Sequence, residues 1–180
     1  KLLNPYSDTR MLHGKKHDDV KTILLGIDIE VGEILLADRL IEKGQKIDLV
    51  LAHHPEGVAL AGFFNVMYMQ VDILNSIGVP INVAESLMLE RIKEVERRVS
   101  PVNHMRAVDA ARLLDIPFMT CHTPSDNCVV NFLQKLMDKK KPDTLGDIMD
   151  ILFDLPEYKL SAELNAPPKI QVVPGATIRL

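Results

Sequence analysis

The fold is decided by residues Val20–Ala52, which read VKTILLGIDIEVGEILLADRLIEKGQKIDLVLA. Two apolar runs of strand length, Val20–Asp28 and Ile47–Ala52, enclose the segment Val31–Ile41, whose apolar residues recur with nearly helical spacing. Gly44 follows this segment at a position that is typical of a helix end. A strand, a helix and a strand in this order form a βαβ unit with a right-handed crossover, so parallel strands are predicted.

The alternation of strand and helix continues toward the carboxyl end of the chain. Further strands are predicted at Val79–Ala84, Ile116–His122 and Lys169–Val173. Helices are predicted at Leu60–Ile77, Ser86–Val99, Asn103–Leu114 and Cys128–Lys140. Repeated alternation of this kind predicts an α/β fold in which helices flank a mostly parallel central sheet.

A helical insertion is predicted late in the chain. Thr144 and Asp147 match a capping box in which Asp replaces the usual Glu, and this box predicts a helix over Leu145–Leu155. A second, shorter helical stretch follows before the last predicted strand. We therefore expect a single α/β domain over residues 1–180, with a helical insertion at 143–166.

The composition is that of an ordinary folded domain and excludes several classes of protein. The chain has 180 residues, of which 47% are hydrophobic and 26% charged, so a disordered or collagen-like protein is excluded. A net charge of −4 argues against a surface for duplex nucleic acid, which needs clustered Lys and Arg. No apolar run reaches the roughly 18 residues of a membrane helix, and the opening residues Lys1–Pro5 do not match the apolar region of a signal peptide, so neither feature is expected. We expect a cytoplasmic protein with no membrane partner.

Polar residues follow the ends of the predicted strands, where ligands bind in open α/β sheets. The first strand leads into Asp28 and Glu30, and the third leads into Glu85. These acids are interpreted first as helix-start residues that face the helix dipole. Histidines follow the second and the fourth strand, so those two strand ends are the better candidates for a site.

His53 and His54 come directly after the second apolar strand and before a proline. Neighbouring side chains of a regular strand point to opposite faces, so two adjacent histidines do not easily bind one ion. A strand end that turns into a loop can instead offer each ring to a different metal ion. The alternative is one buried, hydrogen-bonded histidine beside an exposed one.

His122 and Asp126 lie four residues apart after the fourth predicted strand. Asp126 is an acceptable helix N-cap, and on spacing alone that interpretation is favoured. Its carboxylate is equally able to bind one divalent ion or bridge two, and imidazole is a nitrogen ligand for zinc, iron or manganese. The two histidine motifs together favour a divalent-metal site more than either motif alone.

With these motifs the chain resembles the NIF-three-like family (domain of unknown function thirty-four), whose bacterial members are often labelled GTP cyclohydrolase I type 2 homologues. The resemblance rests on Ile47–Pro55, on Cys121–Asn127 and on the strand Leu24–Asp28, and it covers roughly Lys21–Lys135. It implies an α/β fold, a dinuclear divalent-metal site and a ring-shaped homohexamer built as a trimer of dimers. By position, His53, His54 and Asp126 match metal ligands, and His122 matches a residue that lines the site.

The sequence also departs from the family pattern. The family's site is completed by a carboxy-terminal histidine and a glutamate four residues later, whereas no histidine follows His122 here. Because the chain starts at Lys1 and stops on a strand-like run at Leu180, we expect that it is not the complete gene product. Two ions are then expected in a complete chain, and one weakly held ion in a chain that ends at Leu180.

Two functions from different classes remain. The first is a metal-dependent hydrolase of an unknown small molecule, with His122 as its proton carrier; the cyclohydrolase label itself is not adopted. The second is a metal-binding interaction or scaffold module without turnover. Self-association is expected for either function, because the segment Gly57–Met69 has more apolar surface than one sheet covers. The alternative interpretation of this segment is a fully buried core helix.

Overall fold

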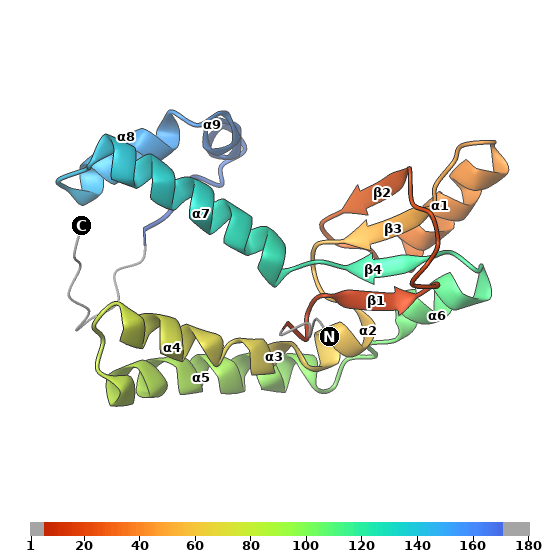
Figure 1. Ribbon diagram of the computed structural model, residues 1–180, viewed down its shortest axis with the longest axis horizontal. Helices are drawn as coiled ribbons and strands as arrows, with labels where there is room; N and C mark the ends of the chain where they lie inside the picture. The colour runs from red at the N-terminus through yellow and green to blue at the C-terminus, as the bar shows by residue number, and fades with distance from the viewer. Residues whose placement is uncertain (1–5, 171–180) are drawn as a thin grey trace.

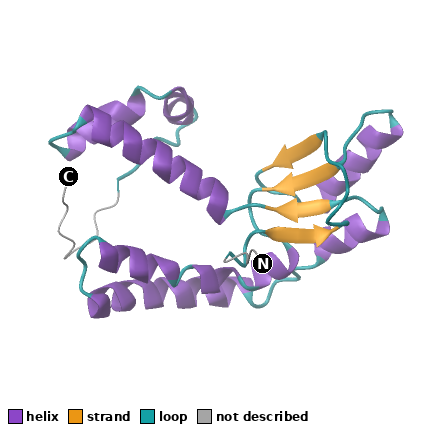
Figure 2. Ribbon diagram, viewed as in Figure 1, coloured by secondary structure: helices purple, strands orange, loops and turns teal. Residues whose placement is uncertain are grey.

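A small mixed sheet organises the fold in a computed structural model of the protein, which describes residues 6–170. Its strands are β1 (Arg10–His13), β2 (Ile23–Gly26), β3 (Leu49–Ala52) and β4 (Phe118–Thr120). They lie side by side in the order β1-β4-β3-β2 (Figures 1 and 2). β2, β3 and β4 are parallel, and β1 pairs with β4 in the antiparallel sense. The predicted α/β fold, with helices flanking a mostly parallel sheet, is confirmed.

Two helices, α1 (Val31–Glu42) and α6 (Arg106–Leu113), pack on one face of the sheet. Each helix presents small or branched residues at helical spacing, such as Ile34 and Ala37 on α1. The strands contribute large side chains to the same core, and Phe118 of β4 is completely buried. The buried cluster consists of Ile29, Ile34, Ala37, Val50, Ala52, Ala107, Val108, Ala111, Ile116 and Phe118. This core fixes the position of the strand ends that carry the histidines.

The opposite face of the sheet is left partly uncovered in the described part of the chain. Leu25, Leu51, Met119 and Met11 are partners in register across all four strands. Leu25 is 68% exposed and Met11 is 39% exposed, whereas the two central residues of this row are half-buried. We call this row the open sheet face.

Two helical arms extend from the end of the sheet where the parallel strands finish (Figure 1). One arm follows α2 (Gly57–Ala61) and contains α3 (Phe63–Val66), α4 (Met69–Ser76) and α5 (Ile81–Val99). The other contains α7 (Thr123–Lys140), α8 (Leu145–Phe153) and α9 (Pro156–Glu163). α4 packs on α5 through a small core of its own around Val71, Val79 and Ala84. The predicted capping box is confirmed, because Thr144 Oγ1 accepts from the Asp147 amide at 3.1 Å and the Asp147 carboxylate accepts from the Thr144 amide at 2.8 Å.

The strand predicted at Val79–Ala84 is wrong, because α5 starts at Ile81 directly after Pro80. The physical reason is visible in the burial pattern of α5. Ala84 and Ile92 are buried, and Met88, between them, packs on the small core of this arm, so the inward residues recur every four positions. The apolar run at 79–84 is therefore the first turn of a long helix and the loop before it.

Other boundaries differ from the prediction. The single helix expected at Leu60–Ile77 is divided into α2, α3 and α4. The helix expected from Cys128 starts five residues earlier, at Thr123. Strand β1 was not predicted, because it lies in a polar amino-terminal segment in which only Met11 and Leu12 are apolar. The last predicted strand, Lys169–Val173, extends beyond the described residues. Within the described residues, no helix combines the length and the apolar character that a membrane span requires.

Candidate metal centre

The histidines of the two motifs lie at the carboxyl ends of the neighbouring strands β3 and β4. The amides of His53 and His54 extend the pairing of β3 with β2, because they donate to the carbonyls of Gly26 at 2.9 Å and Ile27 at 2.8 Å. On the other side, the Cys121 amide donates to the carbonyl of Ala52 at 2.9 Å and brings the residue after it into the same region. Parallel pairing of β3 and β4 is therefore what places the two motifs together.

Three imidazole rings form one cluster at this place. His53, His54 and His122 each offer a ring nitrogen, and these nitrogen atoms all lie within 4.8 Å of one another. The rings of His53 and His122 are stacked with their centroids 4.9 Å apart, and the centroids of His53 and His54 are 5.2 Å apart. The structure thus brings His122, which the resemblance matches to a residue lining the site, together with His53 and His54, two of the three residues that it matches to metal ligands. No other group of this kind is found among the described residues.

Asp126 lies on the first turn of α7, beside the cluster. One carboxylate oxygen, Oδ1, is 3.5 Å from His53 Nε2, and Oδ2 is 3.7 Å from His122 Nε2. Asp126 is not the N-cap of this helix, because the N-cap is His122 and the helix begins at Thr123. The earlier helix start puts His122 and Asp126 on the same face of α7, one turn apart. The N-cap interpretation of Asp126 is therefore wrong.

Asp28 holds the outer ring of the cluster. Its Oδ1 lies 2.7 Å from Nδ1 of His54, although the Asp28 side chain itself is 73% exposed. The carboxylate of Asp28 is thus engaged in a hydrogen bond with the ring of His54. Glu30, by contrast, occupies the N-cap of α1 as expected, where its amide donates to the carboxylate of Glu33 at 2.8 Å.

Asp8 is a buried carboxylate behind the cluster, and the sequence analysis missed it. It is completely buried, and its Oδ2 lies 3.1 Å from Nδ1 of His122 and accepts from the Thr123 amide at 3.2 Å. Its sequence neighbours, Ser7 and Thr9, make it look like an ordinary turn aspartate, so no sequence signal separates it from the other polar residues of the lead-in.

Acidic side chains border the cluster on the side of α2. The pKa of Glu56 is raised to about 7, chiefly by burial and further by the nearby carboxylates of Glu30 and Asp28, with Arg106 acting in the opposite direction. Glu85, the remaining acid of the predicted strand ends, is not at a strand end, because it lies within α5.

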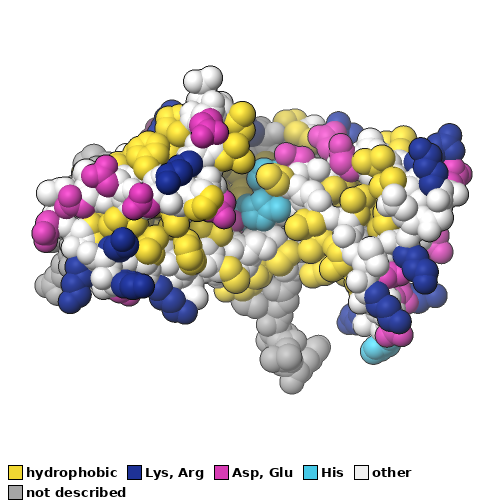
Figure 3. All heavy atoms as spheres, turned by 90° about the horizontal axis from the view of Figure 1, so that it is seen from above, with side chains coloured by type: hydrophobic (Ala, Val, Ile, Leu, Met, Phe, Trp, Pro, Cys, Tyr) yellow, Lys and Arg dark blue, Asp and Glu magenta, His cyan; other side chains and the backbone are white. Residues whose placement is uncertain are grey.

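Figure 3 shows histidine side chains beside a depression in the middle of the molecular surface, with hydrophobic side chains around them. Phe63 contributes to this apolar surrounding, since its ring meets the ring of His122 edge-on with centroids 5.2 Å apart. A polar cluster with an apolar border is the usual composition of a ligand site.

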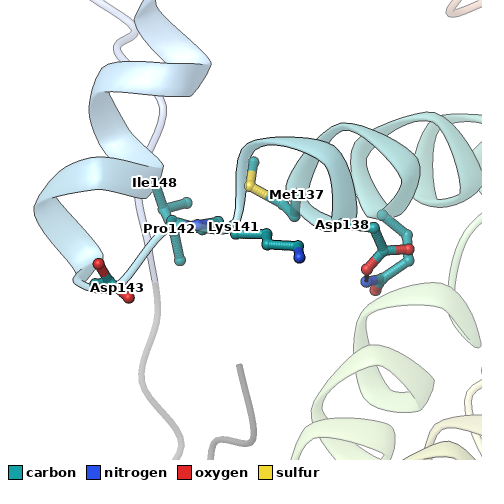
Figure 4. A pocket seen from close by; sticks show the side chains of 7 residues that line it. Met137, Asp138, Lys141, Pro142, Asp143 and Ile148 are labelled. Carbon is teal, nitrogen blue, oxygen red and sulfur yellow. Dashed lines mark hydrogen bonds between the residues drawn. The ribbon is translucent and has the colours of Figure 1, made fainter.

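A separate pocket lies at the corner between α7 and α8 (Figure 4). Its volume is about 540 Å³, and it is lined by Gln134, Met137, Asp138, Lys141, Pro142, Asp143 and Ile148. The hydrogen bond from Gln134 to Asp138, at 2.8 Å, engages two of its polar groups with each other. This pocket shares no residue with the histidine cluster.

Comparison with known proteins agrees with the resemblance found in the sequence. The fold is similar to the crystal structure of a NIF3 superfamily protein from Sphaerobacter thermophilus, with a TM-score of 0.71 and 29% sequence identity. The similarity covers 87% of this chain and 56% of that protein, so the chain spans little more than half of the length of that structure. No family model and no curated protein matches the chain. The shared fold therefore supports the resemblance to the NIF3-like family that the histidine motifs at the ends of β3 and β4 indicate.

Proposed function

We propose that the protein binds a divalent metal ion through His53, His54 and Asp126 and uses it to hydrolyse a small molecule. The observation that carries this proposal is the meeting of three imidazole nitrogens within 4.8 Å, from motifs on two different strands. Two imidazoles and a carboxylate are ligands that suit zinc, iron and manganese alike.

The chemistry of the donor set fits such an ion. Imidazole binds a metal in its neutral form, and a metal-binding histidine commonly donates its second ring N–H to a carboxylate or a carbonyl. His54 has such a partner in Asp28, at 2.7 Å from Nδ1, which leaves Nε2 available to a ligand. Asp126 supplies negative charge on the opposite side, within 3.5 Å of His53.

Each residue has a separate task in the proposed hydrolysis. A divalent ion at this place would polarise the bond to be cleaved and lower the pKa of water to about 7. His53, His54 and Asp126 would hold and orient that ion, and Nε2 of His122, beside Asp126, would act as the proton carrier. The apolar ring of Phe63 contacts one side of His122 edge-on.

The geometry also allows His122 to act as a further ligand. Its ring nitrogen belongs to the same group of atoms as those of His53 and His54. The metal content of a His122→Ala variant separates the two roles. The variant keeps its metal if His122 is only a proton carrier, and it loses metal if His122 is a ligand.

A metal-binding interaction module is the second candidate function. It is favoured by apolar side chains that are exposed along α7, next to the cluster: Val129 is 53%, Val130 is 63% and Phe132 is 54% exposed. The two functions differ in one measurable property, which is metal-dependent turnover.

The experiment is a screen of metal-reconstituted protein against phosphoesters, nucleotides and cyclic amides. Asp126→Asn is the test variant, and Asp138→Asn, on the solvent-exposed part of the same helix, is its matched control. Turnover that needs added metal and Asp126, but not Asp138, supports the hydrolase. If no substrate is turned over in this way, the interaction module replaces it.

Self-association is the remaining part of the proposal, and a homohexamer is the assembly that the family resemblance implies. The segment Gly57–Met69 is not a fully buried core helix, since Val58 is 52% and Tyr68 is 50% exposed. The open sheet face adds a second apolar area, in which Leu25 is 68% exposed. Both surfaces support an assembly that would cover them.

A further inference from the structure

We propose that Asp8 is a positioning residue that holds His122 in the tautomer with its proton on Nδ1, so that the lone pair of Nε2 faces the metal centre. That this lone pair accepts a proton or binds metal rests on the function proposed above, whereas the assignment of the tautomer does not. The two atoms that carry the inference are Asp8 Oδ2 and His122 Nδ1, which lie 3.1 Å apart.

The surroundings of Asp8 explain why its carboxylate is an acceptor. Oδ2 receives the Thr123 amide at 3.2 Å and the Thr123 hydroxyl in a short hydrogen bond. A backbone amide can only donate, so this oxygen presents its lone pairs to its neighbours. The ring nitrogen of His122 that meets the same oxygen must then carry a proton in order to bond to it, which assigns the Nδ1–H tautomer.

Burial makes this arrangement rigid. Asp8 has no exposed surface, and the His122 side chain is only 17% exposed. Further bonds hold the aspartate in place, because Thr9 Oγ1 donates to its Oδ1 at 3.2 Å and Thr120 Oγ1 donates to its main-chain carbonyl at 3.1 Å. A hydrogen bond to an anion in a water-poor place is stronger than one between neutral groups. The ring of His122 therefore has one favoured orientation.

The carboxylate of Asp8 also caps the N-terminus of α7. His122, at the N-cap position, makes no side-chain cap bond, and the Thr123 amide is one of the first amides of the helix, which have no partner inside it. Asp8 supplies that partner from a segment 115 residues away in the sequence. A negative charge at a helix N-terminus is favourable, so α7 and His122 are positioned by one group.

Asp28 provides an internal comparison. It also bonds to Nδ1 of a histidine, His54, at 2.7 Å, but its side chain is 73% exposed. Water competes for such a carboxylate, and its rotation costs little. We therefore expect the tautomer of His122 to be fixed more strictly than that of His54.

The test is nitrogen-15 NMR of the histidine rings in metal-free protein, with His122→Ala to identify the signals of His122. The inference predicts a protonated Nδ1 and an unprotonated Nε2 for His122 in the unaltered protein. An Nε2–H tautomer in that spectrum overturns the inference, and this outcome needs no variant that might fail to fold. Because metal is absent, the result is independent of whether the centre binds metal, and zinc binding by the same sample tests the proposed function separately.

Variants of Asp8 then test the cause. Asp8→Asn keeps an oxygen able to accept from Thr123 and His122, so it is expected to preserve the tautomer, whereas Asp8→Ala is expected to shift His122 toward the Nε2–H form that histidine favours in water. Asp28→Ala is the matched control, because it removes the equivalent carboxylate from Nδ1 of His54 and leaves Asp8 and its hydrogen bonds unaltered. An unchanged His122 spectrum in folded Asp8→Ala protein, or an equal change of that spectrum in Asp28→Ala protein, overturns the role of Asp8.

Discussion

The ring of His53 is stacked on the ring of His122, with an angle of 26° between the two planes. The two residues come from different strands, and the parallel pairing of β3 with β4 is what brings them together. Stacked imidazoles at the end of a sheet, with carboxylates within reach, form a polar cluster that the hydrophobic core does not require. The cluster is therefore the part of the molecule in which function is best sought.

Glu56 gives a prediction for the pH dependence of stability. Because its pKa in the folded protein, about 7, exceeds the ordinary value of 4.5, its contribution to stability is complete below pH 4.5 and is lost as the pH rises through 7. Glu56→Gln removes this loss. We expect the free energy of unfolding of the variant, relative to that of the unaltered protein, to be about 1 kcal/mol higher at pH 8 than at pH 5. The difference is smaller than the full pKa shift would give, because Glu56 is partly exposed and solvent screens its charge.

Urea unfolding of metal-free protein at both pH values measures this difference. Glu94→Gln is the matched control, because the hydrogen bond from Arg91 lowers the pKa of Glu94, which keeps its titration below this pH range. Equal stability differences for Glu56→Gln at pH 5 and pH 8 would contradict the account of its surroundings.

Gly57 is predicted to be sensitive to any side chain. Its φ angle is +57°, and a Cβ atom would lie 2.7 Å from Cγ2 of Val108, which is part of the core. Gly57→Ala is expected to reduce the free energy of unfolding by about 1–3 kcal/mol through backbone strain and overpacking. Gly44→Ala shares the positive φ angle but has open space around it, so the difference between the two variants in thermal unfolding measures the packing part. Equal losses would show that Val108 does not resist the added methyl group.

Self-association through the open sheet face is tested by Leu25→Glu. A buried charge at an interface is costly, so this variant is expected to shift the protein toward a single chain of 20.2 kDa in light scattering. Leu113→Glu is the matched control, since Leu113 is 88% exposed at the end of α6, outside that face. A mass of 20.2 kDa for the unaltered protein across the micromolar range would contradict self-association itself.

The sequence was sufficient to predict the βαβ unit and the place of the histidine motifs. Apolar periodicity identified β2, α1 and β3, and the rule that ligands bind at strand ends brought His53, His54 and His122 into one hypothesis. The error at 79–84 arose because a short apolar run has the same appearance in a strand and in the first turn of a buried helix. Only the spacing of Ala84 and Ile92 along α5 distinguishes them.

Asp8 could not be predicted, because its importance depends on a contact between distant segments. A buried aspartate and an exposed turn aspartate have the same local sequence, and the difference lies in β1 pairing with β4. That pairing brings the residues before β1 against the start of α7. Long-range contacts of this kind leave no periodic signal in the chain.

The most direct test of the account is the metal content of freshly purified protein, measured by elemental analysis, beside a His53→Ala/His54→Ala variant. His17→Ala is the control, because His17 is an exposed histidine of the amino-terminal lead-in, outside the cluster. The account predicts divalent metal in the unaltered protein and in His17→Ala, and a loss of nearly all of it in the double variant. Equal metal content in all three samples, or none in any of them after reconstitution, would contradict the proposed metal centre.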